Sequence, residues 1–125
     1  MLRYVIVIGI ALAAMGAMPN ASAQKTTEIF IPIGKSPGLS GEYTKMGKIE
    51  ALNATDQTVT MSDAAGSYTI QVAEGCSIWL DKSKMKSTNQ VGGFSDLAAG
   101  RMVEVKFKDN NPELGAEWIK VEIPE

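Results

Sequence analysis

Apolar and polar residues alternate in short runs from residue 43 to the end of the chain, and turn-forming residues separate the runs. A period of two places the apolar side chains of each run on one face of a β-strand. Six strands are predicted, with the sequences KMGKIEALN, TVTMS, SYTIQVA, CSIWLD, RMVEVKFK and AEWIKVEI. Their apolar faces carry Gly47, Ile49, Ala51, Val59, Met61, Tyr68, Ile70, Val72, Cys76, Ile78, Leu80, Val103, Val105, Phe107, Ile119, Val121 and Ile123. We therefore expect a small all-β domain around one core.

The segments between these runs differ in character. NATDQT and DAAG have the composition of tight turns. Residues 82–93 form the longest stretch without alternation, and we expect an irregular loop there. In FSDLAAG, Ser95 is suited to cap one short helical turn, Leu97 to pack inward, and Gly100 to end the turn.

The first residues of the chain have the three parts of a secretory signal. Arg3 provides the positive charge, an apolar run follows, and Ala21-Ser22-Ala23 is a small-x-small cleavage site. The run is shorter than the ~20 residues that a membrane-spanning helix needs. We expect cleavage after Ala23, no membrane span in the mature protein, and a periplasmic or secreted location.

Residues 24–42 are predicted to form an extended arm before the domain, which spans residues 43–125. Pro32 and Pro37 prevent a regular element in the arm. Ile29, Ile31 and Ile33 are spaced by two, so an extended arm could place all three against the domain.

Charge and cysteine content limit the possible functions. Loss of Arg3 leaves eleven basic and fourteen acidic residues, a net charge of −3. This mild acidity argues against strong binding of nucleic acid. Cys76 is the single cysteine, so the domain has no internal disulfide and must be held together by its core. The simplest role for Cys76 is that of a small buried apolar residue.

Several segments together resemble a known family. MGKIEALNATDQTVTMS opens the domain, and DLAAGRMVEVKF and AEWIKVEI close it. A Gly-x-Ile opening strand, a middle hairpin, an Asp-Leu-x-x-Gly-x-x-Val-x-Val step and an alanine-led last strand are similar to the small secreted OB-type barrels of bacteria. The resemblance covers residues 43–123. It implies a five- to six-stranded Greek-key OB-like barrel with one short helical turn, and it implies no reaction.

The sequence carries no recognisable catalytic motif. Histidine is absent, which excludes Ser-His-Asp and Cys-His catalysis and most zinc sites. Neither a phosphate-binding loop nor a dinucleotide fingerprint is present. We expect a non-enzymatic binding or interaction module of the cell envelope that requires no cofactor.

Five residues are the candidates for ligand binding. Trp79 and Trp118 fall on strand positions that point away from the core. Lys82, Lys84 and Lys86 follow Trp79, and an extended backbone would direct all three lysines to one side. Aromatic rings beside lysines can stack on a base or a sugar and hold an anionic group. The partner would be an anionic small ligand or an envelope protein. Alternatively, the tryptophans pack under the arm or the long loop, and the lysines are a solvated edge.

A soft-metal site is the alternative from another class. Small periplasmic copper chaperones also use OB barrels, and thioether and thiolate sulfur suit Cu(I). The candidate ligands here are Met46, Met61, Cys76 and Met102. Histidine is missing, however, and Met61 and Cys76 fall on the predicted core face, so core packing explains these residues better.

Overall fold

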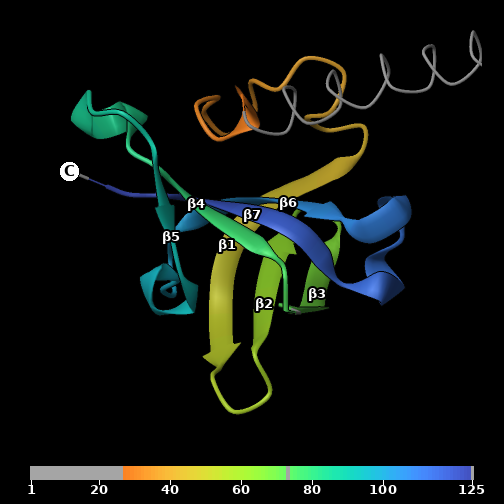
Figure 1. Ribbon diagram of the computed structural model, residues 1–125. Coiled ribbons are helices and arrows are strands. Elements are labelled where there is room, and N and C mark those ends of the chain that lie inside the picture. Colours follow the sequence, from red (N-terminus) through yellow and green to blue (C-terminus); the bar gives the residue numbers. More distant parts are fainter. Residues whose placement is uncertain (1–26, 73, 125) are drawn as a thin grey trace, which may run out of the picture.

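The computed structural model describes residues 27–72 and 74–124 (Figure 1). The predicted signal peptide, residues 1–23, and the cleavage position lie outside these residues. The described chain is all-β, as predicted, and its seven strands form one mixed sheet. The strands are β1 (Thr44–Asn53), β2 (Thr58–Asp63), β3 (Gly66–Gln71), β4 (Ser77–Asp81), β5 (Gln90–Gly92), β6 (Met102–Phe107) and β7 (Ala116–Glu122).

The strand order across the sheet is β3-β2-β1-β6-β7-β4-β5. Neighbouring strands are antiparallel except β4 and β7, which are parallel. The long strand β1 joins the two parts of the sheet, because its first residues pair with β6 and its later residues pair with β2. Four short 3-10 turns connect strands within the described chain: η1 (Ser83–Met85), η2 (Phe94–Asp96), η3 (Lys108–Asn110) and η4 (Pro112–Leu114).

The core lies on one face of this curled sheet and confirms most of the predicted pattern. Val59, Met61, Val103, Val105 and Ile119 are almost completely buried. Tyr68, Cys76 and Ile123 pack against the same cluster from partly buried positions. Alternation therefore predicted the core side of nearly every strand.

Ala51 is an exception, because β1 contains a bulge. Ile49 pairs with Met61 but Ala51 pairs with Thr60, so Glu50 is the extra residue. A bulge reverses the facing of the residues that follow it. Ala51 is consequently exposed, and the prediction that it lies on the core face was wrong.

Residues 82–93 are more regular than predicted. They contain the turn η1 and the strand β5, which pairs with β4. β5 is the strand that was not among the six predicted. The predicted helical turn exists as η2, but its cap is not Ser95: the Asp96 side chain accepts a 2.8 Å hydrogen bond from the Gly93 amide. Leu97 is buried as expected, and Gly100 has a φ of +90°.

The described arm, residues 27–42, is not extended. Backbone hydrogen bonds close turns from Phe30 to Thr27, from Lys35 to Pro32 and from Leu39 to Ser36. Ile29, Ile31 and Ile33 are half-buried. In Figure 1 the arm runs along one side of the sheet before it enters β1.

Candidate functional site

The sheet face opposite the core carries an unusual set of side chains. Glu104 lies on β6, Trp118 and Lys120 lie on β7, and Trp79 and Asp81 lie on β4. We call these five residues the outer face. The strand register places Lys120 between Glu104 and Trp79. All five are buried, and residues of the arm contact Lys120, Glu104 and Asp81 directly.

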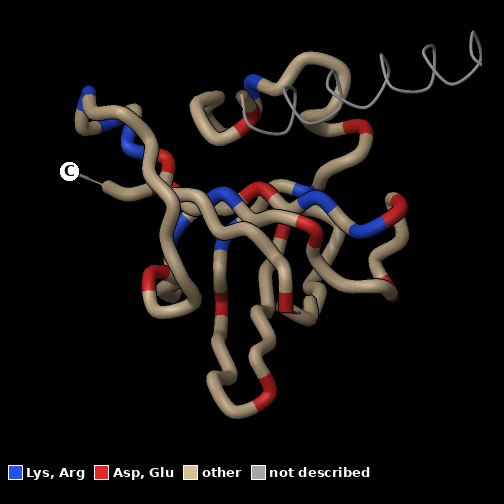
Figure 2. The backbone as a smooth tube through the Cα atoms, viewed as in Figure 1, with Lys and Arg blue, Asp and Glu red and all other residues tan. Residues whose placement is uncertain are grey.

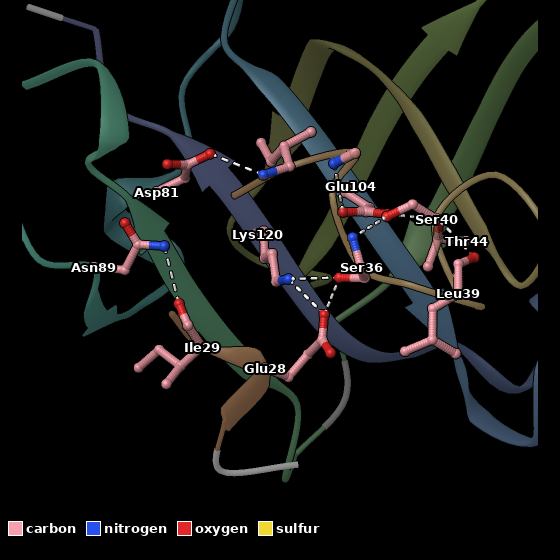
Figure 3. Close-up of polar contacts among 12 residues, drawn as sticks. Glu28, Ile29, Ser36, Leu39, Ser40, Thr44, Asp81, Asn89, Glu104 and Lys120 are labelled. Atoms are coloured by element: carbon pink, nitrogen blue, oxygen red, sulfur yellow. Dashed lines mark hydrogen bonds and ion pairs between the residues drawn. The ribbon is translucent and has the colours of Figure 1, made fainter. Parts of the chain in front are cut away.

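Lys120 is the centre of this face. Its side chain is completely buried, and its Nζ donates to Glu28 Oε1 at 2.6 Å and to Ser36 Oγ at 3.1 Å (Figure 3). Ser36 Oγ also donates to Glu28. Glu28 and Ser36 belong to the arm, so this ion pair fastens the arm to β7. A buried ammonium group requires such a partner, since the loss of its hydration costs several kcal/mol.

The two carboxylates of the outer face bind the arm as well. Glu104 accepts hydrogen bonds from the Gly34 amide at 3.1 Å, Ser40 Oγ at 2.6 Å and Thr44 Oγ1 at 2.8 Å. Asp81 accepts one from the Ile33 amide at 2.9 Å (Figure 3). These carboxylates thus satisfy main-chain amides that the irregular arm cannot pair within itself.

The aromatic pair lies beside Lys120. Trp79 and Trp118 are stacked with ring centroids 5.3 Å apart and an interplanar angle of 28°. Lys120 Nζ lies 4.9 Å from the Trp118 centroid, within the range of a cation–π contact. Both tryptophans point away from the core, as predicted, but only 6% and 2% of their surfaces are exposed. With the arm in place, a ligand cannot stack on either ring.

Among the described residues, every buried side-chain nitrogen and oxygen has a hydrogen-bond partner. The charged side chains of the outer face are therefore paired within the protein. The charged side chains of this face bind the arm through hydrogen bonds and an ion pair.

Lys82, Lys84 and Lys86 lie outside the outer face, in the loop between β4 and β5. Lys82 Nζ donates to Gln90 Oε1 at 2.7 Å, and Lys84 Nζ lies 3.2 Å from Glu122 Oε1. Lys86 is exposed and has a left-handed backbone, with φ of 56°. The prediction of an extended backbone was wrong, because residues 83–85 form the turn η1. The structure thus separates the predicted site into buried tryptophans and solvent-facing lysines.

The candidate metal ligands do not share one site. Met61 lies in the core, where none of its surface is exposed. Met46 pairs with Glu104 and its sulfur lies near Gly34, so it faces the arm on the other side of the sheet. Met102 faces the same side as Glu104, since the two are spaced by two on β6. Cys76 packs against the core but is only half-buried, so it is less buried than the small-residue role predicts.

In the described part of the chain, clefts also open elsewhere on the surface. One of about 470 Å³ is bordered by Gln71, Cys76 and Phe94, where the chain passes from β3 to β4. Another of about 370 Å³ is bordered by Tyr43, Lys45 and Asn110. None of the five predicted ligand-binding residues lines either cleft.

Comparison of the chain with known protein families, curated proteins and solved structures found no match. Within the described residues, no helix has the length and apolar character needed to cross a membrane.

Sequence reasoning missed how the arm is held. Glu104 and Lys120 occupy outward positions in alternating strands, where charged residues normally meet water. The two outward tryptophans were the available signal that this face is covered. Sequence reasoning also did not identify Met85, which is exposed between two lysines in the β4–β5 loop.

Proposed function

We propose that this chain is an exported, non-enzymatic binding module of the cell envelope, and that Lys82, Lys84 and Lys86 contact an anionic partner. The observation that carries the proposal is the loop between β4 and β5. Figure 2 displays blue segments along this loop, at the periphery of the molecule. Residues 82–95 contain three lysines and no acidic residue, in a chain whose net charge is negative.

The arrangement of the loop supports this role. Lys84 remains 59% exposed although it contacts Glu122, Lys86 is exposed, and no residue of η1 is buried. Exposed ion pairs of this kind are worth ~0–1 kcal/mol, so an anionic partner can compete for the Lys84 ammonium. We assign the tryptophans a supporting role: they fill the space under the arm beside the base of the loop.

An OB-like barrel is the fold we propose for this module. β3 and β4 are consecutive along the chain, and only residues 72–76 separate them, yet they lie far apart in the strand order. Residues of both strands contribute to one core cluster. This favours a sheet that curls until the chain itself links its two sides, with β3 and β4 as two parts of one bent strand. In such barrels, the loops and outer faces present ligands.

A charge-reversal experiment tests the anion-binding role. The variant K82E/K84E/K86E is compared with K35E/K48E/K108E, which changes net charge equally but alters the arm, β1 and the turn after β6. The probe is a sulfated oligosaccharide, and its affinity is measured by isothermal titration calorimetry. We expect a loss of about tenfold or more in the loop variant, because three contacts of ~0.5 kcal/mol each sum to one decade.

The control variant should retain most of its affinity. Equal losses in both variants would mean that only net charge matters, and the loop would not be the site. Absence of binding to the sulfated oligosaccharide and to anionic lipid alike would refute the proposed function.

A further inference from the structure

The tip of the β4–β5 loop combines positive charge with an exposed apolar side chain. Met85 lies between Lys84 and Lys86 in the sequence and is 44% exposed. Val91, on the strand that leaves the loop, is 71% exposed. We call Lys82, Lys84, Met85, Lys86 and Val91 the loop surface. Lysines alone would suffice to bind a small anion. A partner that also contacts Met85 and Val91 must offer an apolar surface beside its negative charge.

The loop is held in a defined shape. Asn89, which is buried, accepts a 2.8 Å hydrogen bond from the Lys82 amide and donates a 3.0 Å hydrogen bond to the Ile29 carbonyl. Asp81 accepts a 2.9 Å hydrogen bond from the Ser83 amide. The Lys86 and Ser87 amides close the turn through bonds to Ser83 and Lys82.

These hydrogen bonds fix the conformation of the turn that carries Met85. Part of the entropy cost of binding has been met before the partner arrives. The left-handed backbone of Lys86, which costs about 1–2 kcal/mol in a non-glycine residue, is retained in this turn.

We infer that the loop surface docks on an anionic phospholipid bilayer, with the lysines at the headgroup phosphates and Met85 at the boundary of the acyl chains. This inference rests on the proposed function and names its partner. A bilayer interface offers both chemistries at once, negative charge at the surface and an apolar layer beneath it. A soluble sulfated or phosphorylated ligand would leave Met85 and Val91 in water.

The charges set the expected selectivity. A lysine close to an anionic membrane surface favours binding by about fivefold, so three give roughly a hundredfold preference over a neutral bilayer. Glu122, which contacts Lys84, and Asp81, which binds the Ser83 amide, are acidic residues that oppose this effect at the loop. The remainder of the acidic molecule is repelled, which orients the loop surface toward the bilayer.

Vesicle flotation tests the inference with the protein that begins at Gln24. Vesicles of phosphatidylcholine alone are compared with vesicles that also contain phosphatidylglycerol, at low and high salt. We expect binding to the phosphatidylglycerol vesicles, its loss in K82Q/K84Q/K86Q, and its weakening at high salt. M85S should reduce the partition coefficient about threefold or more, because it removes the apolar contact.

Leu114 provides a matched control, since it is 48% exposed and lies in η4, between β6 and β7. L114S should bind vesicles like the unchanged protein. Equal binding of M85S and L114S, or no preference for phosphatidylglycerol vesicles, would overturn the bilayer assignment. If the sulfated oligosaccharide still bound through the lysines, the proposed anion-binding function would stand without the bilayer assignment. If neither the vesicles nor the oligosaccharide bound, the bilayer assignment and the proposed function would both be refuted.

Discussion

Removal of the Lys120 ammonium should destabilise the protein strongly. The variant K120M keeps most of the side-chain volume but leaves Glu28, which is 5% exposed, without its buried cation. Breaking a buried ion pair from one side costs about 3–5 kcal/mol, because the remaining charge stays desolvated. Ser36 would still donate to Glu28, so we expect the lower end of this range.

Docking of the arm limits how much stability K120M can lose. Glu28 belongs to the arm, and detachment of the arm would return its carboxylate to water. The loss in K120M therefore cannot exceed the free energy with which the arm docks. If that limit is reached, Trp79 and Trp118 become exposed in a protein whose core is still folded.

Urea denaturation followed by tryptophan fluorescence measures both effects. The midpoint and slope give the free energy of unfolding, and the emission wavelength before the transition reports whether the tryptophans are covered. The double variant E28Q/K120M removes both charges and should recover much of the loss. A decrease of less than ~1 kcal/mol in K120M, with unchanged native emission, would refute the role of Lys120 as the anchor of the arm.

Three further predictions concern the sheet and the loop. G47A should destabilise the protein by about 1–3 kcal/mol in urea denaturation, because its Cβ would lie 2.2 Å from the Ser62 carbonyl oxygen. G93A, which meets nothing within 4 Å, should be tolerated. N89A should cost about 1–3 kcal/mol and speed amide exchange in residues 83–88 in a hydrogen-exchange experiment; unchanged exchange would contradict its role as the loop anchor. K86G should raise stability by up to ~1 kcal/mol because glycine relieves the left-handed backbone, while it weakens binding of anionic probes. A K86G protein with lower stability would show that the lysine side chain, not its backbone, dominates at this position.

The strands were predictable because one face of each strand packs on the core. Val103, Val105 and Phe107 alternate with charged residues, and this period alone identifies β6 and its buried side. Two features escaped the pattern. The bulge at Glu50 inserts one residue without any turn-forming signal, and β5 is only three residues long and ends in glycine.

The outer face was harder to predict, for a physical reason. Periodicity distinguishes the two sides of a strand, but it does not distinguish water from a covering segment. Lys120 has the same place in the alternation as a solvated lysine would have, but its ammonium group binds residues more than eighty positions earlier in the chain. Such contacts between distant parts of the chain have no local signature in either segment.

The basic composition of the β4–β5 loop was predictable from the sequence, but its backbone conformation was not. The spacing of Lys82, Lys84 and Lys86 indicated a basic segment, but an extended chain and a 3-10 turn direct those side chains differently. The turn depends on Asp81 and Asn89, which bind its amides from the ends of the neighbouring strands. Met85 becomes prominent only once this turn is known.

The most direct test of the central claim is to map where an anionic probe binds. An isotope-labelled protein would be titrated with the sulfated oligosaccharide, and the amide chemical shifts of the whole domain would be followed by NMR. We predict that the perturbed amides cluster in residues 82–92 and that those of residues 108–115 remain unchanged. Perturbations centred on the turn between β6 and β7 or on either cleft, or scattered over the surface without a centre, would contradict the assignment of the β4–β5 loop.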